Sequence, residues 1–516
     1  MFLLRAGIAA AGLVSSALGF VNKTTCNGKT YTYEELAGYG TVPSNSRDEF
    51  GDTLNFGSGL ALDRSQWKKL SNGSYTGVLW GLPDRGWNTQ GTLNFQPRVH
   101  KFDILFTPKP EATVANPSAK NLIFTYKETI RFYGPDGTPC TGLDGDTTGH
   151  LSYPGFPDLP VATFTGDGFG GPGPGGKRIP VDSEGIVLNA DGSFWISDEY
   201  GPFVYRFNAS GRMTTAIRPP PAILPMRNGT VSFSADSPAY YEGADAEPVI
   251  PSDGPTGRNN NHGFEGLTVS GDGKNLYLLL QAATNQEGGL TSQTERYTRL
   301  LKYDISVPSK PRHARQFVVP LPLYVDPTAK PAKNPKVASQ SELFHIQDEQ
   351  FFVLARDSNF GHGQDVTLST YRHIDIFDVS AATDIMGDTY DCANCSVASS
   401  QGVLKAGIKP AEYCSFIDMN LNSQLNRFGA HNGGAQDADL LNEKWESIGI
   451  VPVDGLVGDD DEWFVFSISD NDFITQDGYM NGGAFKYADE SGFNLENQAL
   501  VFKIKLPEHS RPFNRD

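Results

Sequence analysis

Carboxylate side chains recur at two places in a repeated pattern along the chain. Glutamates open short apolar segments at Glu184, Glu265, Glu342 and Glu446. Aspartates end the apolar segments that follow at Asp84, Asp198, Asp357 and Asp470. Carboxylates held close together repel one another, so such a group normally binds a cation or shares protons. Because hard oxygen ligands favour Ca²⁺ or Mg²⁺ over zinc, we expect a calcium site here. The expected ligands are Glu184, Glu265, Glu342, Glu446, Asp470 and Asp472.

Arginine and histidine side chains lie beside these acids. Arg85 follows Asp84 and Arg356 precedes Asp357, and a guanidinium suits bidentate contact with phosphate or carboxylate. His262 stands just before a glutamate phrase and could act as an acid or a base. The expected catalytic group is Asp84, Arg85, Asp198, Glu199, His262, Arg356 and Asp357. The alternative is that the acids cap turns and that each Arg–Asp pair holds a loop.

The elements that would position these residues form a three-part repeat. A small residue or carboxylate, then Gly or another short step, leads into an alternating apolar strand at 57–62, 183–188, 264–269, 341–346 and 445–450. A second strand follows at 78–82, 194–197, 276–280, 351–355 and 463–468. A third follows at 98–106, 203–207, 298–305, 373–379 and 500–506. Turn residues at 189–192 and 270–273 separate first from second strands, as hairpins require.

This repeat predicts an all-β fold, a single β-propeller with antiparallel blades around a central channel. Five blades are recognisable, and we expect a sixth, since residues 107–182 and 380–444 are long enough to contain one or to be loops. Residues 31–35 could complete the last blade and close the ring, and 435–445 is the one helix expected. A β-sandwich is the main alternative, but it does not explain the repetition. In a propeller the repeated acids meet at the mouth of the channel.

The N-terminus has the parts of a secretory signal peptide. Arg5 precedes an apolar run at 6–18 and small residues near Gly19. The run is shorter than the roughly 20 apolar residues that span a bilayer. We therefore expect a secreted, extracellular protein that does not enter a membrane. Its expected parts are a signal peptide (1–19), an N-terminal segment (20–49), the propeller (50–506) and a C-terminal tail (507–516).

Glycosylation acceptors and cysteines agree with export. Asn-x-Ser/Thr sequences occur at Asn22, Asn72, Asn208, Asn228 and Asn394. The five cysteines are Cys26, Cys140, Cys392, Cys395 and Cys414. With no second Cys-x-x-Cys sequence nearby, the one at 392–395 indicates a structural disulfide rather than zinc or redox chemistry. One thiol is left over, and spacing does not decide the pairing.

The charge balance narrows the function classes. The chain has 60 acidic and 42 basic side chains, a net charge of −18, which argues against nucleic acid as a partner because that binding depends on Lys and Arg.

The Gly-rich segment 166–171 is followed by prolines rather than a helix, so it is expected to be a loop and not a phosphate site. The chain contains neither a Gly-x-Ser-x-Gly nor a His-Glu-x-x-His sequence. We expect a monomer.

Several phrases resemble the phytase-like family, also described as "esterase-like activity of phytase". They are residues 182–187, 195–202 and 262–267 and the step at 84–86, and the similarity extends over roughly residues 50 to 506. The resemblance implies a propeller that hydrolyses phosphate esters or other esters. The Asp-Asp-Pro-Ala motif of alkaline propeller phytases is absent from the sequence, so the residues that bind metal and phosphate in those enzymes are not transferred here.

The expected activity is metal-assisted hydrolysis of a small-molecule ester or phosphate ester at the propeller mouth. Ca²⁺ held by Glu184, Glu265 and neighbouring acids would neutralise substrate charge. One alternative is a calcium-dependent lactonase or carboxylesterase. Another is a non-catalytic binding propeller whose rim aromatics, Trp87, Tyr200 and Phe203, hold a glycan or peptide.

Overall fold

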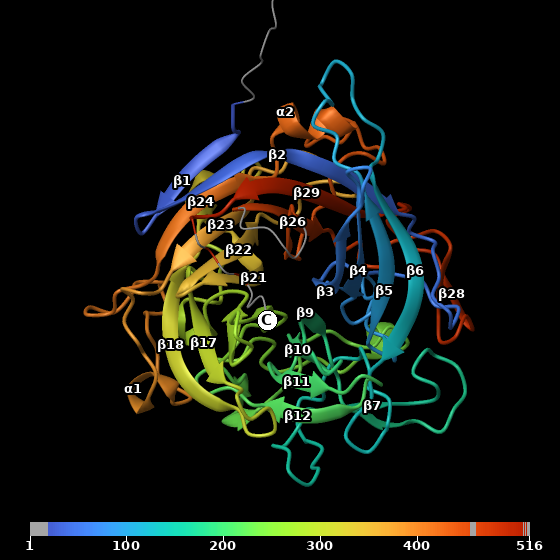
Figure 1. Ribbon diagram of the computed structural model, residues 1–516. Helices are drawn as coiled ribbons and strands as arrows, with labels where there is room; N and C mark the ends of the chain where they lie inside the picture. The colour runs from blue at the N-terminus through green and yellow to red at the C-terminus, as the bar shows by residue number, and fades with distance from the viewer. Residues whose placement is uncertain (1–18, 455–460, 509, 511, 513–516) are drawn as a thin grey trace, which may run out of the picture.

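Five antiparallel sheets stand around a common axis in the computed structural model, which describes residues 19–454, 461–508, 510 and 512 (Figure 1). Blade 1 consists of β3 (Gly59–Lys69), β4 (Tyr75–Leu82), β5 (Arg98–Phe106) and β6 (Leu122–Arg131). Blade 2 consists of β9 (Ser183–Leu188), β10 (Phe194–Asp198), β11 (Val204–Phe207) and β12 (Met213–Ile217). Blade 3 consists of β15 (Phe264–Val269), β16 (Asn275–Leu280), β17 (Tyr297–Asp304) and β18 (Arg312–Pro320). Blade 4 consists of β21 (Ser339–Gln347), β22 (Gln350–Arg356), β23 (Arg372–Asp378) and β24 (Glu412–Asp418).

Blade 5 is built from both ends of the chain. It consists of β25 (Gly449–Pro452), β26 (Glu462–Ile468), β29 (Asn497–Lys505), β2 (Lys29–Val42) and β1 (Asn22–Cys26). The N-terminal β2 pairs antiparallel with the C-terminal β29, with Tyr39 opposite Leu500. The N-terminal segment therefore closes the ring, and the prediction that residues 31–35 complete the last blade is confirmed.

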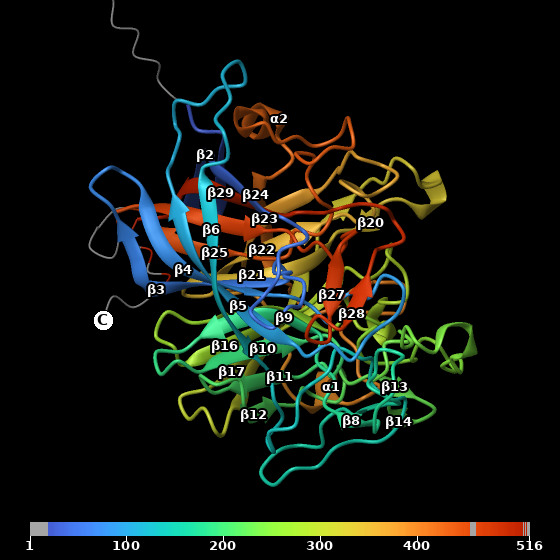
Figure 2. The same ribbon diagram turned by 90° about the vertical axis from the view of Figure 1, so that its right-hand side faces the viewer.

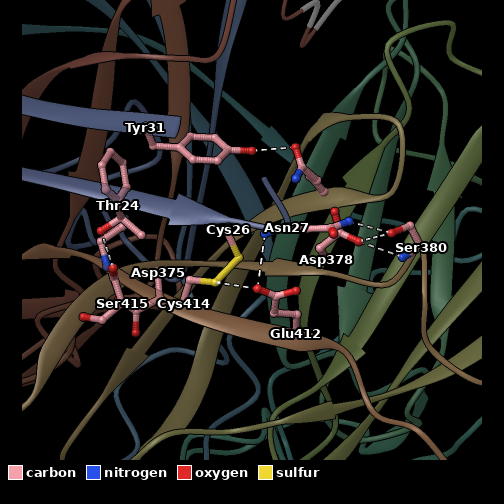
Figure 3. The surroundings of a disulfide bond; sticks show 12 residues. Thr24, Cys26, Asn27, Tyr31, Asp375, Asp378, Ser380, Glu412, Cys414 and Ser415 are labelled. Atoms are coloured by element: carbon pink, nitrogen blue, oxygen red, sulfur yellow. Dashed lines mark hydrogen bonds between the residues drawn. A yellow bond between two sulfur atoms is a disulfide. The ribbon is translucent and has the colours of Figure 1, made fainter. Parts of the chain in front are cut away.

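A disulfide fixes this closure to the neighbouring blade. Cys26 at the end of β1 is bonded to Cys414 on β24 (Figure 3). Beside it, Asn27 donates a backbone hydrogen bond to Glu412 at 3.2 Å and a side-chain one to Ser380 at 2.9 Å. Because the bonded cysteines are 388 residues apart, the crosslink restricts the unfolded chain strongly, by about 6 kcal/mol in a chain-entropy estimate.

The Cys-x-x-Cys prediction is also confirmed. Cys392 and Cys395 form a second disulfide, and Cys140 is a buried free thiol.

The glycine of the repeated phrase allows the inner strands of neighbouring blades to approach one another closely. A Cβ on Gly59 would lie 2.0 Å from the carbonyl oxygen of Glu184, and one on Gly185 would lie 2.6 Å from the Cβ of Leu267. Gly266 is equally close to Leu343 of the next blade. The Glu-Gly phrase therefore repeats for a packing reason: the glycine makes room for the adjacent blade, while the glutamate before it is held on the inner strand.

The hydrophobic core fills the spaces between blades. All residues of β22 are buried. Phe351 and Val353 pack toward blade 3, and Phe352 and Leu354 pack toward blade 5. Successive residues of a strand point to opposite faces, so a middle strand that is covered on both faces is apolar throughout.

The two ends of the channel differ. Hairpins between first and second strands lie at one end, seen with β3 and β4 at the left of Figure 2. The other end, here called the loop face, carries the loops that join second to third strands and one blade to the next. Those loops contain small sheets: β7 (Ala162–Phe164) with β8 (Gly176–Arg178), β13 (Met226–Arg227) with β14 (Thr230–Val231), β19 (Leu323–Tyr324) with β20 (Lys336–Val337), and β27 (Gly478–Met480) with β28 (Phe485–Tyr487). The two α-helices of the described residues are the short α1 (Asp388–Asp391) and α2 (Asn422–Leu425).

Most strand predictions are confirmed, and two expectations are wrong. The expected sixth blade is not found among the described residues, because 107–182 and 380–444 supply the outer strands β6 and β24 and loop-face segments. The expected helix at 435–445 is a loop. Its neighbourhood explains this: Gly433 and Gly434 have positive φ, and Asn442 donates to Ser469 across the loop.

The described residues include no helix that is long and apolar enough to cross a membrane. The expected signal peptide, apart from Gly19, lies outside the described residues.

Candidate functional site

Three carboxylates of blade 2 converge at the loop face. Glu184 is on the inner strand β9, Asp182 immediately precedes that strand, and Glu199 follows β10. A backbone hydrogen bond from Glu199 N–H to Asp182 C=O, 3.0 Å long, holds the two segments together. Each side chain offers an oxygen within 4.8 Å of the others. We call these three residues the blade-2 triad.

The triad is buried and incompletely satisfied. Asp182, Glu184 and Glu199 are each at most 5% exposed. The Oε1 atom of Glu199 has no hydrogen-bond partner within the described part of the chain. A buried carboxylate oxygen without a donor is costly. At a separation near 5 Å and an effective dielectric constant of 20, two ionised carboxylates repel by about 3 kcal/mol. The donor set, three hard oxygens with one unsatisfied atom, fits a divalent cation such as Ca²⁺.

Five more acids from other blades surround the triad. Glu265 comes from β15, Glu446 from the loop before β25, Asp470 and Asp472 from the loop after β26, and Asp84 from the loop after β4. The axial acid cluster comprises Asp84, Asp182, Glu184, Glu199, Glu265, Glu446, Asp470 and Asp472. The repeat thus brings together residues from four blades, as the propeller geometry predicts.

Burial and mutual repulsion favour the protonated forms in this cluster. Burial, followed by the charge of Glu265, raises the pKa of Glu184 well above its ordinary value. The pKa of Glu265 is raised by burial and then by Glu199, and that of Glu199 by burial and then by Asp182. For Asp84 the causes are burial and then Asp470. Without a cation, therefore, several of these groups hold protons at pH values where an exposed carboxyl is ionised.

Three basic side chains partly balance the acids. Arg85 Nη1 lies 3.2 Å from Asp182 Oδ2, and Arg356 Nη2 donates to Glu446 Oε1 at 2.5 Å. Lys444 is the third, beside Asp472. Within the described part of the chain, the Nε atoms of Arg85 and Arg356 have no hydrogen-bond acceptor. These arginines therefore retain donors that could contact a bound anion.

Three of the acids singled out from the sequence accept hydrogen bonds from backbone N–H groups instead. Asp198 accepts hydrogen bonds from the N–H groups of Asp182 and Gly201, at 2.9 and 2.8 Å. Asp357 accepts from Ser369 and from the Thr370 N–H.

Glu342 accepts from the N–H groups of Leu343 and Leu267, at 2.7 and 3.1 Å. Burial raises its pKa and these two hydrogen bonds lower it in part, whereas neighbouring acids raise the pKa values of Glu184 and Glu265. The turn-capping alternative describes Asp198 and Asp357, and Glu342 binds strand amides.

His262 lies near the blade-2 triad, beside Glu295, an acid that was not predicted from the sequence. Its Nδ1 is 3.6 Å from Glu295 Oε2. The adjacent Gly263 packs against the backbone of Glu199. Burial, then the charge of Arg258, lowers the pKa of His262 to about 4, so its imidazole is neutral at neutral pH and can accept a proton.

The expected aromatic rim is not a binding surface. Trp87, Tyr200 and Phe203 are each at most 1% exposed. Trp87 stacks on Tyr487, and Phe203 stacks on Tyr205. These rings are core of the loop face, and the expectation that they hold a glycan or peptide is wrong.

Besides Glu295, two members of the site were missed, and the spacing could have revealed them. Asp182 lies two residues before Glu184, and Lys444 lies two residues before Glu446. In extended chain, residues i and i+2 point to the same side, so each of these two side chains faces the same way as the glutamate that follows it.

The fold and the site together define the class: a five-bladed β-propeller with a buried group of carboxylates and basic side chains at the loop end of its channel. The chain belongs to the phytase-like family, because the model of that family, described as "Esterase-like activity of phytase", matches residues 65–413. An uncharacterized secreted protein of Arthroderma benhamiae is 53% identical over 470 residues, which cover 90% of this chain and 91% of that one. The protein is thus a secreted member of the family, and the membership points to a hydrolase-like function.

Solved structures resemble the chain only remotely. The virginiamycin B lyase of Staphylococcus aureus covers 91% of this chain and 99% of its own at 9% identity and a TM-score of 0.25. An N-acetylgalactosamine deacetylase from F. plautii covers 92% and 95% at 10% identity and a TM-score of 0.28. We infer nothing about activity from similarities of this size.

Proposed function

We propose that the protein is a secreted hydrolase that cleaves phosphate esters, or related esters of small molecules, at the axial acid cluster with the help of a divalent cation, Ca²⁺ in the first instance. The observation that carries this proposal is the convergence of Asp182, Glu184 and Glu199 beside the guanidinium of Arg85. Bound there, the cation would neutralise negative charge on the substrate and acidify a water molecule.

The chain's own residues then have separate tasks. Arg85 and Arg356 have N–H groups without acceptors in the described structure and would bind two phosphoryl oxygens. Glu199, buried and with an unpartnered Oε1, would hold the cation with one carboxylate oxygen and take the proton of the attacking water with the other. The water oxygen bonds to phosphorus, the ester oxygen leaves, and the proton returns to the departing alcohol. His262, neutral at neutral pH, is the second candidate proton acceptor.

The polarity of the site favours a phosphate ester over a lactone. The cluster has three basic side chains within it, whereas a lactonase would need an apolar wall beside its metal. The aromatic side chains Trp87, Tyr200 and Phe203 do not form such a wall, because they are buried in the core. A carboxylic ester remains the second candidate, since the family description names esterase-like activity.

Metal analysis of the secreted protein, paired with hydrolysis of p-nitrophenyl phosphate and p-nitrophenyl acetate with and without a chelator, tests the proposal. Bound calcium and chelator-sensitive phosphate release support it. Cleavage of the acetate alone would favour the esterase or lactonase. A protein that binds no metal and turns over neither ester would be a binding propeller whose acids are structural.

Glycan attachment belongs to the same proposal of an extracellular protein. Asn72 and Asn394 are exposed and Asn208 is half-exposed, and we propose that these three carry glycans. The Nδ2 atom of Asn22 donates to the Phe416 carbonyl at 2.6 Å, and that of Asn228 donates to Ile250 at 3.0 Å. Because a glycan is attached to that atom, we expect these two sites to be bare in peptide mass spectra.

A further inference from the structure

A lysine lies inside the axial acid cluster, in contact with its blade-5 members. Lys444 stands in the loop before β25, and its Nζ donates to Asp472 Oδ1 at 2.7 Å. The same Nζ is 3.7 Å from Glu446 Oε1. We call Asp470, Asp472 and Glu446 with Lys444 the blade-5 group.

Carboxylates from two blades surround the ammonium group of this side chain. Asp472 and Glu446 lie 2.7 and 3.7 Å from its Nζ, and its charge also interacts with Asp470 and, from blade 1, Asp84. Four carboxylates thus act on one ammonium, an arrangement that resembles the oxygen surroundings of a metal ion.

The backbone fixes the lysine in this place. The Asp470 N–H donates to the Lys444 carbonyl at 2.7 Å, and Trp445 pairs with Ser469 in an isolated β-bridge. The buried indole of Trp445 donates to the Asn442 carbonyl at 3.0 Å. The loop before β25 and the loop after β26 are therefore tied together, and Lys444 has little freedom to leave the acids.

The blade-2 triad differs in this respect. Arg85 contacts one member, Asp182, through its guanidinium at 3.2 Å and its backbone N–H at 3.1 Å, whereas Glu199 keeps a buried, unpartnered oxygen. We propose that Lys444 is a built-in cation that takes the place of a second divalent ion, so that the cluster holds one exchangeable metal. This inference rests on the proposed function insofar as the triad is the exchangeable site.

The test is the number of divalent ions that each variant binds. Isothermal titration with CaCl₂ in 0.15 M KCl, which suppresses weak surface binding, should give one tight equivalent for the wild-type protein and two for Lys444→Met. Lys444→Arg keeps the charge and should stay at one equivalent.

Lys336→Met is the matched control. Lys336 donates to Asp326 at 2.6 Å and is 23% exposed, against 26% for Lys444, but it lies on β20 outside the cluster. Lys336→Met should also bind one equivalent of Ca²⁺, because the substitution leaves only Asp326 without its cation, whereas Lys444→Met leaves four carboxylates without theirs.

The outcomes separate this inference from the proposed function. If the wild type binds no metal but Lys444→Met binds one, the built-in cation is supported and the metal-assisted hydrolase is not. An unchanged count in folded Lys444→Met, or two tight equivalents in the wild type, overturns the inference. If Lys444→Met unfolds in chelator, recovery of its circular dichroism on adding Ca²⁺ supports the inference, and failure to recover counts against it.

Discussion

The two sides of the axial acid cluster contain similar acids in different surroundings. On the blade-2 side, three buried carboxylates face one another with an unsatisfied oxygen at Glu199. On the blade-5 side, Asp470 accepts hydrogen bonds from Asn55 and Ser58, at 2.8 and 2.6 Å, while Lys444 neutralises its neighbours. The difference shows that a repeated acid marks a place in the fold, and that the partners supplied by each blade decide what the acid can do.

The proposed roles of the two sides differ accordingly: exchangeable metal binding on the blade-2 side and fixed structure on the blade-5 side. A carboxylate that is already satisfied by donors gains little from a metal, whereas unsatisfied, mutually repelling carboxylates gain much. Substitutions on the blade-2 side should therefore change metal binding and turnover, and those on the blade-5 side should change stability and metal count.

The largest effect is expected for Glu184→Gln. The change removes a charged oxygen ligand from the triad, and Ca²⁺ affinity should fall by more than about 100-fold, since partners that merely orient ligands already account for 10- to 100-fold. Hydrolysis of p-nitrophenyl phosphate should be lost with it. Titration calorimetry and steady-state kinetics measure the two quantities.

Glu342→Gln is the matched control for this substitution. Glu342 occupies the equivalent place on the inner strand of blade 4, but its carboxylate accepts two backbone N–H groups. Metal affinity should stay within about twofold of the wild type while the protein loses stability. Equal loss of metal in both variants would mean that the triad is not the binding site.

Sequence reasoning found the ring and part of the site for identifiable physical reasons. The second strand of each blade is largely buried and apolar, so it stands out, as β22 does. The fourth strands were missed because they lie at the outside: most residues of β6 are exposed or half-buried, and they include charges such as Lys127 and Glu128. Apolar periodicity is weak in such a strand.

The site was predictable only as a set of positions. Glu184 and Glu265 were found because the Glu-Gly phrase repeats, and they do meet at the mouth. Asp198 and Asp357 repeat as regularly, yet they cap turns. Spacing alone cannot separate these outcomes, since both depend on where the backbone N–H groups of the following loop point.

The next largest effect should come from the arginines, and it should be unequal. Arg85→Met should lower kcat/KM for p-nitrophenyl phosphate roughly 100-fold, the size of effect typical of removing a donor to a developing anion. Arg356→Met should lower it less, because Arg356 is engaged by Glu446 at 2.5 Å. Kinetics with both substitutions measure the ratio.

Arg206→Met serves as the control, because Arg206 pairs with Asp191 at 2.7 Å on the far hairpin of blade 2. Equal losses for Arg85 and Arg356 would mean that the ion pair with Glu446 does not limit the contact of Arg356 with the phosphoryl group. A loss for p-nitrophenyl acetate as large as that for the phosphate would mean that Arg85 supports the site rather than binding the phosphoryl group.

The smallest effect is on stability and depends on pH. Burial, followed by the charge of Glu199, raises the pKa of Glu265, so its folded-state pKa exceeds its unfolded value near 4.3. The stabilisation from binding this proton is present below that unfolded value and is lost as pH rises through the folded pKa. In chelator, Glu265→Gln should therefore be more stable than the wild type at pH 8, by on the order of 2 °C in Tm, and the advantage should shrink at pH 5.

Glu462 on β26 offers a control of opposite sign. Burial raises its pKa, but hydrogen bonds from Lys503 and Lys505 outweigh burial and lower it. A group of this kind contributes stability above its unfolded pKa and loses it as pH falls, so Glu462→Gln should cost stability at pH 8 and less near pH 4. Scanning calorimetry of both variants at the two ends of the range measures the difference. If Glu265→Gln were less stable than the wild type at pH 8 in chelator, the acids would be ionised at no cost without a cation, and the reason for assigning a metal to the blade-2 side would be removed.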